Sequence, residues 1–413
     1  MIKEIKKINC RMCKSDNVQK FLDLGFSALS DNFLTIEQLE ESERFFPLTV
    51  HLCSNCGLCQ LGHVVPPELM FNKDYPYDSS TTKTGREHFT KMGIDICDEF
   101  DLKQNSLVID VGSNSGVLLS AFKSKGMKVL GIEPSSKLAN AAIEKGVDSI
   151  IEFFSNKLVK KILDDYGKVS VITGTNVFAH IDDLDDFMLT ADSLLVDNGI
   201  IVIEAPYLLY LIENMEYDTI YHEHLSYLSV KPMVEFCKKF GFEIFDIKEQ
   251  AIHGGTLRYF ISRKNKKEIT QEVSNYLKIE DEKELYSEEK LNGFANLVKN
   301  HRRMLLELLN DLKKDGKKIV AISAPAKGNT LLNYCKIDSE ILDYVTERNP
   351  LKINKFTPGM HIPVYSDEKL LEDQPDYALI LAWNFADEII QNNSNYQKKG
   401  GKFIIPIPKP RIV

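Results

Sequence analysis

Short apolar runs alternate with longer amphipathic stretches through the middle of the chain. The apolar runs cover residues 107–111, 128–132, 169–173 and 199–204, with turn-forming residues around them. Strands that alternate with helices in this way are typical of a parallel sheet with helices on its faces. The pattern therefore predicts a central α/β domain with a Rossmann-like order of elements over residues 76–265.

A second alternation of the same kind fills the last third of the chain. We expect strands at residues 318–323, 342–346, 377–382 and 402–405. A helix is expected over residues 291–314, where apolar side chains recur with helical spacing before Asp315-Gly316 ends the pattern. Residues 264–290 are rich in Lys and Glu and predict an exposed helix with linker character. Residues 266–413 thus form linker helices and a small Rossmann-like domain.

The first 75 residues hold five of the eight cysteines among short, turn-rich segments. Cys10-x-x-Cys13 and Cys53-x-x-Cys56 each direct two thiolates to one side of a turn, and four thiolates satisfy tetrahedral Zn²⁺ in a structural site. The 39 residues between the two pairs must then fold into a small domain that joins them. Two reduced surface pairs are the alternative, and Cys59 is a possible competitor of Cys56.

Composition and charge narrow the possible classes of protein. A chain of 413 residues predicts two or three domains, and 43% hydrophobic with 27% charged residues is ordinary for a globular protein. A net charge of −9 argues against nucleic acid as a partner, because phosphate binding needs clustered Lys and Arg. We see no targeting segment or membrane span and expect a cytoplasmic protein, as a monomer or weak oligomer.

A glycine-rich turn follows the first central apolar run. Gly112 and Gly116 allow the backbone to pass close to a ligand, and the helix that begins after them favours an anionic group at its N-terminus. Residues 113–115, Ser-Asn-Ser, replace the central glycine of the Gly-x-Gly-x-x-Gly fingerprint, which suits S-adenosylmethionine better than a pyrophosphate. A strand–turn–helix unit without a ligand is the alternative.

Polar residues after the next two runs complete this candidate cofactor site. Glu133 ends the second run, 23 residues after Asp110, where a carboxylate can accept hydrogen bonds from both ribose hydroxyls. Residues 173–180 follow the third run, where methyltransferases usually line the pocket of the sulfonium group. The residues expected to hold the cofactor are Asp110, Gly112, Asn114, Gly116, Glu133, Pro134, Ser135, Asn176 and Phe178.

Tyr221-His-Glu-His224 places a phenol, two imidazoles and a carboxylate in four consecutive residues. A second metal site or a solvated loop is possible, but the spacing is not that of the helical HExxH motif. We favour acid–base chemistry: His224 would remove a proton beside a ketone, a neighbouring acid, Glu223, would orient it, and Tyr221 or a second histidine would donate to the enolate oxygen. His180 is the second histidine that we expect there.

Taken together, these motifs resemble the sugar C-3 methyltransferases of deoxysugar biosynthesis, which methylate nucleotide-linked 4-keto-deoxyhexoses. The resemblance runs nearly end to end. Besides the paired CxxC motifs, the 110–116 loop, Asn176-Val-Phe-Ala-His180 and the 221–224 motif, it rests on Tyr75-Pro-Tyr-Asp-Ser-Ser80, His253-Gly-Gly-Thr256, Ala324-Pro-Ala-Lys-Gly-Asn-Thr-Leu-Leu-Asn-Tyr334, Arg348-Asn-Pro350 and Pro358-Gly-Met-His-Ile-Pro363.

The resemblance implies roles for particular residues. Its zinc ligands fall on the four cysteines of the CxxC pairs, its general base falls on His224, and further active-site positions fall on Tyr221, Glu223 and His180. One family tyrosine near the methyl donor corresponds to Tyr75 or Tyr77.

The resemblance also implies that the C-terminal domain holds the nucleotide-linked sugar. Three candidates lie on a strand-to-helix turn whose backbone amides suit phosphate, and three weaker ones lie in polar loops. They are Lys327, Gly328 and Asn329 on the turn, and Glu347, Asn349 and His361 in the loops. The resulting hypothesis is an S-adenosylmethionine-dependent C-methyltransferase with structural zinc. An O- or N-methyltransferase, or an inactive sugar-nucleotide-binding scaffold, is the alternative.

Overall fold

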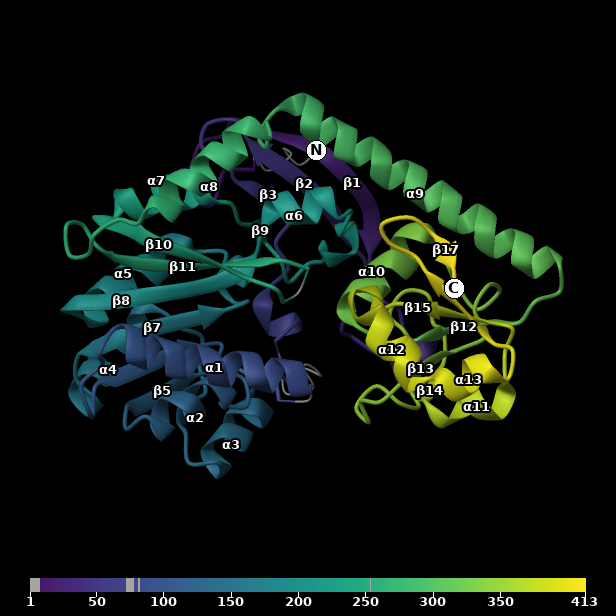
Figure 1. Ribbon diagram of the computed structural model, residues 1–413, viewed down its shortest axis with the longest axis horizontal. Coiled ribbons are helices and arrows are strands. Elements are labelled where there is room, and N and C mark those ends of the chain that lie inside the picture. Colours follow the sequence, from purple (N-terminus) through teal and green to yellow (C-terminus); the bar gives the residue numbers. More distant parts are fainter. Residues whose placement is uncertain (1–7, 72–77, 81, 253) are drawn as a thin grey trace.

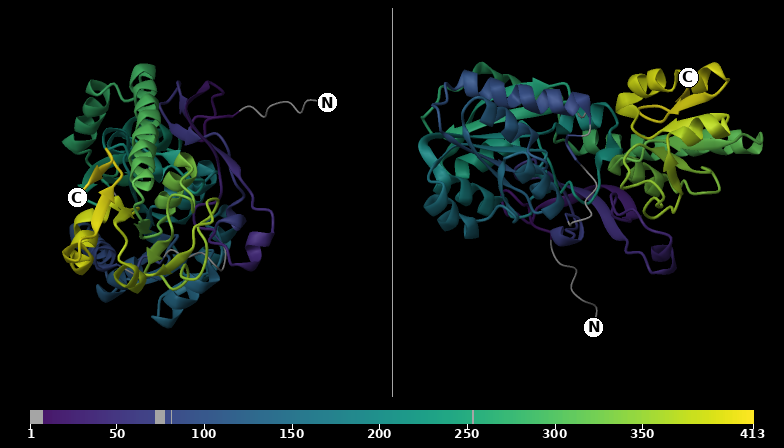
Figure 2. Two further views of the ribbon diagram at one scale, coloured as in Figure 1. Left: turned by 90° about the vertical axis from the view of Figure 1, so that its right-hand side faces the viewer. Right: turned by 90° about the horizontal axis from the view of Figure 1, so that it is seen from below.

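The computed structural model describes residues 8–71, 78–80, 82–252 and 254–413. Three β-sheets form the frame, and the long helix α9 (Glu288–Lys314) spans from the central part to the C-terminal part (Figure 1). The N-terminal part lies to one side, and its residues Arg11 and Glu43 contact the central and C-terminal parts, respectively (Figure 2). This α/β architecture confirms the predicted fold class, whereas the boundaries at residues 75 and 265 stay predictions.

The N-terminal sheet has the strand order β1-β2-β3-β9 and is antiparallel at every pairing. Its strands are β1 (Val18–Ser27), β2 (Phe46–Cys53), β3 (Cys59–Leu61) and β9 (Ser226–Tyr227). The last strand comes from the central part of the chain, directly after the 221–224 motif. That motif is therefore attached to the sheet that carries the cysteine pairs.

The central sheet has the order β10-β11-β8-β7-β4-β5-β6, in which β4 to β8 run parallel and β10 and β11 form an antiparallel hairpin at one edge. Its strands are β4 (Leu107–Val111), β5 (Lys128–Ile132), β6 (Asp148–Ile150), β7 (Val169–Thr175), β8 (Leu195–Pro206), β10 (Phe242–Gln250) and β11 (Thr256–Arg263). All four predicted strands are present. The order reverses between β4 and β7, so a ligand crevice is expected at their carboxyl ends.

Helices cover this sheet on both faces (Figure 1). They are α1 (Lys83–Glu99), α2 (Val117–Ser124), α3 (Ser136–Glu144), α4 (Val159–Asp165), α5 (Leu184–Leu194) and α7 (Val230–Lys239), whereas α6 (Leu208–Glu213) lies beyond the sheet next to residues 217–219. Short 3₁₀ turns include η4 (Phe178–His180) and η5 (Tyr217–Thr219), which carry or precede the reactive side chains. None of the helices in the described ranges is long and apolar enough to span a membrane.

The C-terminal sheet, order β14-β13-β12-β15-β16-β17, is parallel except for its last pairing. It contains β12 (Ile319–Ile322), β13 (Val345–Glu347), β14 (Val364–Ser366), β15 (Tyr377–Ile380), β16 (Lys402–Ile405) and β17 (Arg411–Ile412). Its helices are α10 (Ala326–Cys335), α11 (Glu368–Asp373), α12 (Ala386–Asn392) and α13 (Ser394–Lys398), with a 3₁₀ turn, η6 (Trp383–Phe385). The predicted second Rossmann-like sheet is thereby confirmed.

The segment 264–290 differs from the exposed linker that its charge predicts. Helix α8 (Gln271–Glu282) buries Val273, Tyr276 and Glu280. The Glu280 carboxylate accepts hydrogen bonds from the backbone amides of Val230 and Lys231 at the start of α7. The hydroxyls of Tyr207 and Tyr286 also donate to it, and burial raises its pKa. The charge-rich sequence gave no indication that one acid, Glu280, is buried and holds α8 against α7.

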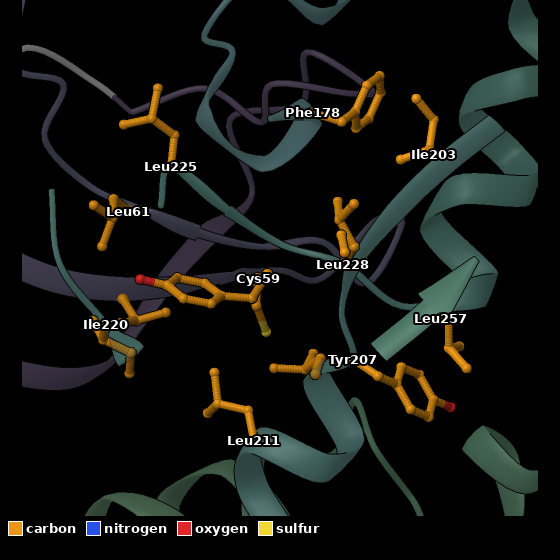
Figure 3. Close-up of a cluster of buried hydrophobic side chains, with 14 of the residues drawn as sticks. Cys59, Leu61, Phe178, Ile203, Tyr207, Leu211, Ile220, Leu225, Leu228 and Leu257 are labelled. Atoms are coloured by element: carbon orange, nitrogen blue, oxygen red, sulfur yellow. The ribbon is translucent and has the colours of Figure 1, made fainter. Parts of the chain in front are cut away.

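A hydrophobic cluster lies beneath the 221–224 motif. Ile220 and Leu225 flank the motif and are 1% and 2% exposed, respectively. They point into a core shared with Leu61 from β3 and Ile203 from β8 (Figure 3). Because both ends of this short loop are anchored in packed side chains, the residues between them have little freedom to move.

We predict that replacing Glu280 by Ala destabilises the fold by about 3 kcal/mol, because two backbone amides and two hydroxyls lose a buried acceptor. Urea denaturation measures the change. Glu282→Ala on the exposed side of the same helix should shift the free energy of unfolding by less than about 0.5 kcal/mol. Equal effects from the two variants would contradict this account.

Candidate functional site

The four predicted thiols converge at one end of the N-terminal sheet. Their sulfur atoms all lie within 4.8 Å of one another, with 3.6 Å between Cys10 and Cys56 and 3.5 Å between Cys13 and Cys53. Four thiolates about 2.3 Å from a tetrahedral Zn²⁺ would stand about 3.8 Å apart. The observed spacing fits this ion, and a full set of four thiolates is characteristic of a structural site.

Strand pairing explains how pairs 39 residues apart meet. In the β1–β2 ladder Val18 lies opposite Cys53, so the chain after the first pair runs beside the second. Each pair closes with the same turn, in which a residue with positive φ, Lys14 or Gly57, donates its amide to the carbonyl of the first cysteine. Cys59 points elsewhere and is fully buried on β3, so the geometry selects Cys56.

The glycine-rich turn lies at the switch point between β4 and β7. Gly112 and Gly116 have φ values of 65° and 76°, a region that side-chain-bearing residues avoid. A Cβ atom on Gly112 would come within 2.7 Å of Val177 Cγ2, so the turn packs directly on the chain that leads to His180. The left-handed glycines are thus required both by conformation and by this close approach.

Two buried acids serve the turn. Glu133 accepts the amide of Asn114 at 2.9 Å and that of Ser135 at 2.8 Å, and burial raises its pKa. Each carboxylate oxygen keeps a second lone pair for a ligand hydroxyl. Asp110 accepts the Thr173 hydroxyl at 2.7 Å, and burial raises its pKa to about 7.

Unsatisfied polar atoms indicate where a ligand belongs. Ser113 Oγ, Ser135 Oγ and Asn176 Oδ1 are buried without a hydrogen-bond partner among the described residues. They follow β4, β5 and β7, three adjacent strands of the sheet. Buried polar atoms usually have partners, and an amino acid joined to a nucleoside carries the hydroxyls, amines and carboxylate to supply them. These residues fit S-adenosylmethionine.

Other predicted cofactor residues occupy different surroundings. The Phe178 ring is 1% exposed and packs on Phe187 and Phe236 in the core. Ser115 Oγ donates to Asp78 at 2.7 Å, so the chain around residues 78–80 lies on the glycine turn. Tyr75 and Tyr77, just before it, lie outside the described residues, as does His253.

The structure brings His180 and His224 together. Their rings stack with 5.0 Å between centroids, and the Tyr221 ring lies 4.0 Å from that of His224. His180 N donates to Val177 O, the residue that packs on Gly112. The imidazole pair and the cofactor turn are therefore joined through one short segment. Glu223, which directly precedes His224 in the sequence, is also buried.

One hydrogen bond sets the tautomer of His224. Its Nδ1 lies 2.7 Å from the carbonyl oxygen of Thr219, which can only accept, so Nδ1 carries the proton and Nε2 the lone pair. Burial, with a smaller contribution from His224, holds the pKa of His180 well below its usual value. At neutral pH His180 is an uncharged donor or acceptor.

The surroundings of His222 differ from those of His224. It is buried, its Nε2 contacts the carbonyl of Phe46 on β2, and burial lowers its pKa to about 4. A neutral imidazole held against the N-terminal sheet supports the loop instead of facing the glycine turn.

The candidate phosphate turn at the start of α10 is closely packed. Lys327 Nζ lies 4.3 Å from the centroid of the Trp383 ring, and burial lowers the pKa of this lysine. Gly328 approaches β15 so closely that a Cβ would lie 2.8 Å from Leu381 Cβ. Asn329 donates to the carbonyl of Ser30 at 2.6 Å, which ties the turn to the N-terminal segment.

The loop candidates divide between two locations. Glu347 accepts the amides of Ala324, Arg348 and Asn349 at 2.8, 2.7 and 3.0 Å, one amide more than Glu133 accepts at the cofactor turn. His361 instead contacts Glu43 of the N-terminal segment at 2.8 Å. Glu347 and Asn349 thus lie beside the α10 turn, and His361 lies at a contact between parts of the protein.

Sequence analysis missed the residues that hold these groups in place. Trp383 Nε1 donates to Asp218 Oδ2 at 2.7 Å, next to the Thr219 that orients His224. Arg11 reaches from the first cysteine pair to Asp182 and Leu225. Two features of the sequence could have drawn attention to these residues: Trp383 is the only tryptophan, and Arg11 lies inside a CxxC motif. Neither feature indicates which distant residue the side chain contacts.

Three separate ranges of the chain match known protein families. Residues 10–71 match a zinc binding domain, and residues 90–247 match a methyltransferase domain. Residues 251–408 match the family described as C-methyltransferase C-terminal domain.

One relative matches over nearly its whole length. The C-methyltransferase NovU of Streptomyces niveus is 33% identical over 406 residues, 98% of this chain and 96% of that protein.

Two solved methyltransferase structures each align with less than half of the chain. An S-adenosylmethionine-dependent methyltransferase of Clostridium acetobutylicum ATCC 824 is 14% identical at a TM-score of 0.35, over 43% of this chain and 92% of that one. The magnesium protoporphyrin IX methyltransferase of Synechocystis PCC 6803 is 13% identical at a TM-score of 0.35, over 45% and 90%. These values carry no information about substrate.

We predict that Cys56→Ser loses most of its bound zinc and that its midpoint of thermal unfolding falls, because metal binding contributes folding free energy. Cys59→Ser should keep the zinc of the wild type. Metal analysis of the two purified variants checks this. Zinc loss in Cys59→Ser with retention in Cys56→Ser would overturn the ligand assignment.

Gly112→Ala should weaken the binding of S-adenosylhomocysteine by at least about tenfold, because the added Cβ strains the backbone and displaces Val177. Gly316→Ala is the matched control, since its φ is 70° and nothing lies within 4 Å of the added atom. Calorimetry measures both affinities. Unchanged binding in Gly112→Ala would remove the turn from the cofactor site.

Proposed function

The chain belongs to the family of C-methyltransferases, and from that premise we propose that it methylates a carbon, C-3, of a nucleotide-linked 4-keto-deoxysugar. S-adenosylmethionine is the methyl donor and supplies an electrophilic methyl group. The observation that carries the proposal is the stacked His180–His224 pair, which residues 177–180 connect to the glycine turn. A carbon acceptor needs a base next to the donor, and this pair provides one.

The residues of the glycine turn bind and orient the donor. Glu133 accepts the ribose hydroxyls, while Ser113, Ser135 and Asn176 satisfy the polar groups of the amino acid and nucleoside. Pro134 shapes the turn between Glu133 and Ser135. These residues would hold the donor at the carboxyl ends of β4 and β7, where the strand order reverses.

His224 acts as the general base. Its Nε2 takes the proton from the carbon beside the ketone, and the electron pair of the broken C–H bond moves into an enolate. Tyr221 and His180 donate to the enolate oxygen, and the Thr219 carbonyl, in place of the Glu223 carboxylate expected from the sequence, orients the base. The enolate carbon then forms its bond to the methyl group while the bond from that methyl to sulfur breaks. Base and donor on opposite faces of the sugar would give inversion.

The C-terminal turn holds the nucleotide. Backbone amides of Lys327 and Gly328 bind phosphate, Asn329 holds the turn through the hydrogen bond from its amide to the Pro325 carbonyl, and Glu347 binds the ribose. Asn349 lies beside that carboxylate, and His361 contributes from the neighbouring loop. The sugar then extends across the interface toward His224. We also propose that the protein is cytoplasmic and is a monomer or weak oligomer.

The direct test uses a panel of nucleotide-linked keto-sugars with a donor whose methyl carbon is ¹³C. The proposal expects a product whose labelled methyl shows one-bond coupling to a ¹³C-enriched sugar carbon. A methyl attached through oxygen or nitrogen would show no such coupling and would support the O- or N-methyltransferase alternative. The absence of any methylated product together with no heat of binding for S-adenosylhomocysteine would favour the scaffold alternative.

His224→Asn should lower kcat by about 1000-fold, because the asparagine amide cannot take a proton. Affinity for S-adenosylhomocysteine should change less than about twofold, since the ring does not hold the donor. His63→Asn, in the N-terminal segment, is the matched control and should keep the kcat of the wild type. Wild-type turnover in His224→Asn would remove this residue from the base role.

A further inference from the structure

Arg11 connects the cysteine pairs to both histidine-bearing loops. It is 7% exposed, and its Nε donates to Asp182 Oδ1 at 3.0 Å. Its Nη1 donates to the carbonyl oxygens of Leu61 and Leu225 at 3.0 and 3.1 Å. The guanidinium therefore contacts the N-terminal sheet and two separate segments of the central part.

The two central contacts lie next to the reactive imidazoles in sequence. Asp182 follows His180 by two residues, and Leu225 directly follows His224. These two rings stack at 5.0 Å between centroids. One guanidinium thus contacts the Asp182 side chain on one segment and the Leu225 carbonyl on the other, so it links the two segments that carry the pair.

The backbone of Arg11 is also held in place. Its backbone amide donates to Gln60 Oε1 at 2.8 Å, and Gln60 is fully buried. Cys10 and Cys13, on either side, are ligands of the zinc site. A buried guanidinium is costly unless each of its donors is paired, and its planar fork fixes the directions of those partners. The Arg11 side chain therefore forms a fixed connection between the zinc site and the segments that carry the two histidines.

We propose that Arg11 is a positioning residue that transmits the rigidity of the zinc-bound turn to the His180–His224 pair. This inference rests on the proposed function of His224 as the base. It assigns the N-terminal domain a part in the reaction: the domain sets the distance between the base and the group that assists it. A displacement of about 1 Å in such a pair lowers the rate by about 100-fold.

The test compares Arg11→Lys with Lys14→Met. Lysine keeps the positive charge but not the fork, so the contacts to Asp182 and Leu225 cannot both survive. Lys14 lies in the same turn and contacts the Arg11 carbonyl and Asp185 instead, so its loss is a matched control. The measurements are zinc content, affinity for S-adenosylhomocysteine, the side-chain signals of His180 and His224 by NMR, and steady-state kinetics.

The proposal expects Arg11→Lys to keep its zinc and its affinity for S-adenosylhomocysteine, to shift both histidine signals, and to lower kcat by about 10- to 100-fold with little change in KM. Lys14→Met should match the wild type in all four measurements. Wild-type histidine signals in zinc-loaded Arg11→Lys would overturn the proposal, because Arg11 would then only fill space.

Asp182→Asn keeps the test decisive if Arg11→Lys does not fold. The Asp182 side chain is 59% exposed, so its loss leaves the core intact, yet it removes the charged partner of Nε. A shift of the His180 signal supports the proposal, and an unchanged signal contradicts it. The NMR result does not depend on turnover, so the role of Arg11 and the choice of sugar substrate can fail separately.

Discussion

The hydrogen bond from His224 Nδ1 to the Thr219 carbonyl is the contact on which the proposed chemistry depends. It places the ring lone pair on Nε2, and a base with the other tautomer would direct its lone pair into the protein. All three parts of the molecule hold this contact in place. The C-terminal part anchors η5 through Trp383 and Asp218, the N-terminal part holds Leu225 through Arg11, and the core beneath Ile220 and Leu225 supports the loop.

The two Rossmann-like sheets place a carboxylate in the same position. Glu133 follows β5 and accepts the Asn114 amide from the turn after β4, while Glu347 ends β13 and accepts the Ala324 amide from the turn after β12. In each sheet the acid stiffens a strand-to-helix turn whose amides suit an anion, and it keeps at least one lone pair for a ribose hydroxyl. The methyl donor, which contains a nucleoside, would use one of these turns, and the sugar nucleotide would use the other.

Much of this architecture can be read from local sequence, because strands, turns and CxxC pairs are defined by neighbouring residues. The four central strands, the zinc cysteines and the glycine turn follow from such patterns. Glu280 could not be predicted, since a buried acid in a charge-rich helix has the same sequence signature as an exposed one. Arg11, Asp218 and Trp383 act on partners more than a hundred residues away, and a single sequence contains no record of which distant residues meet.

Solvent exchange at the sugar carbon tests the central claim most directly. Wild-type protein and the keto-sugar nucleotide are incubated in deuterated water with S-adenosylhomocysteine in place of the methyl donor. The account predicts that one deuterium enters at the carbon beside the ketone, the same carbon that is methylated when the donor is present. Methyl transfer by the same protein preparation without any deuterium entering at that carbon would contradict it.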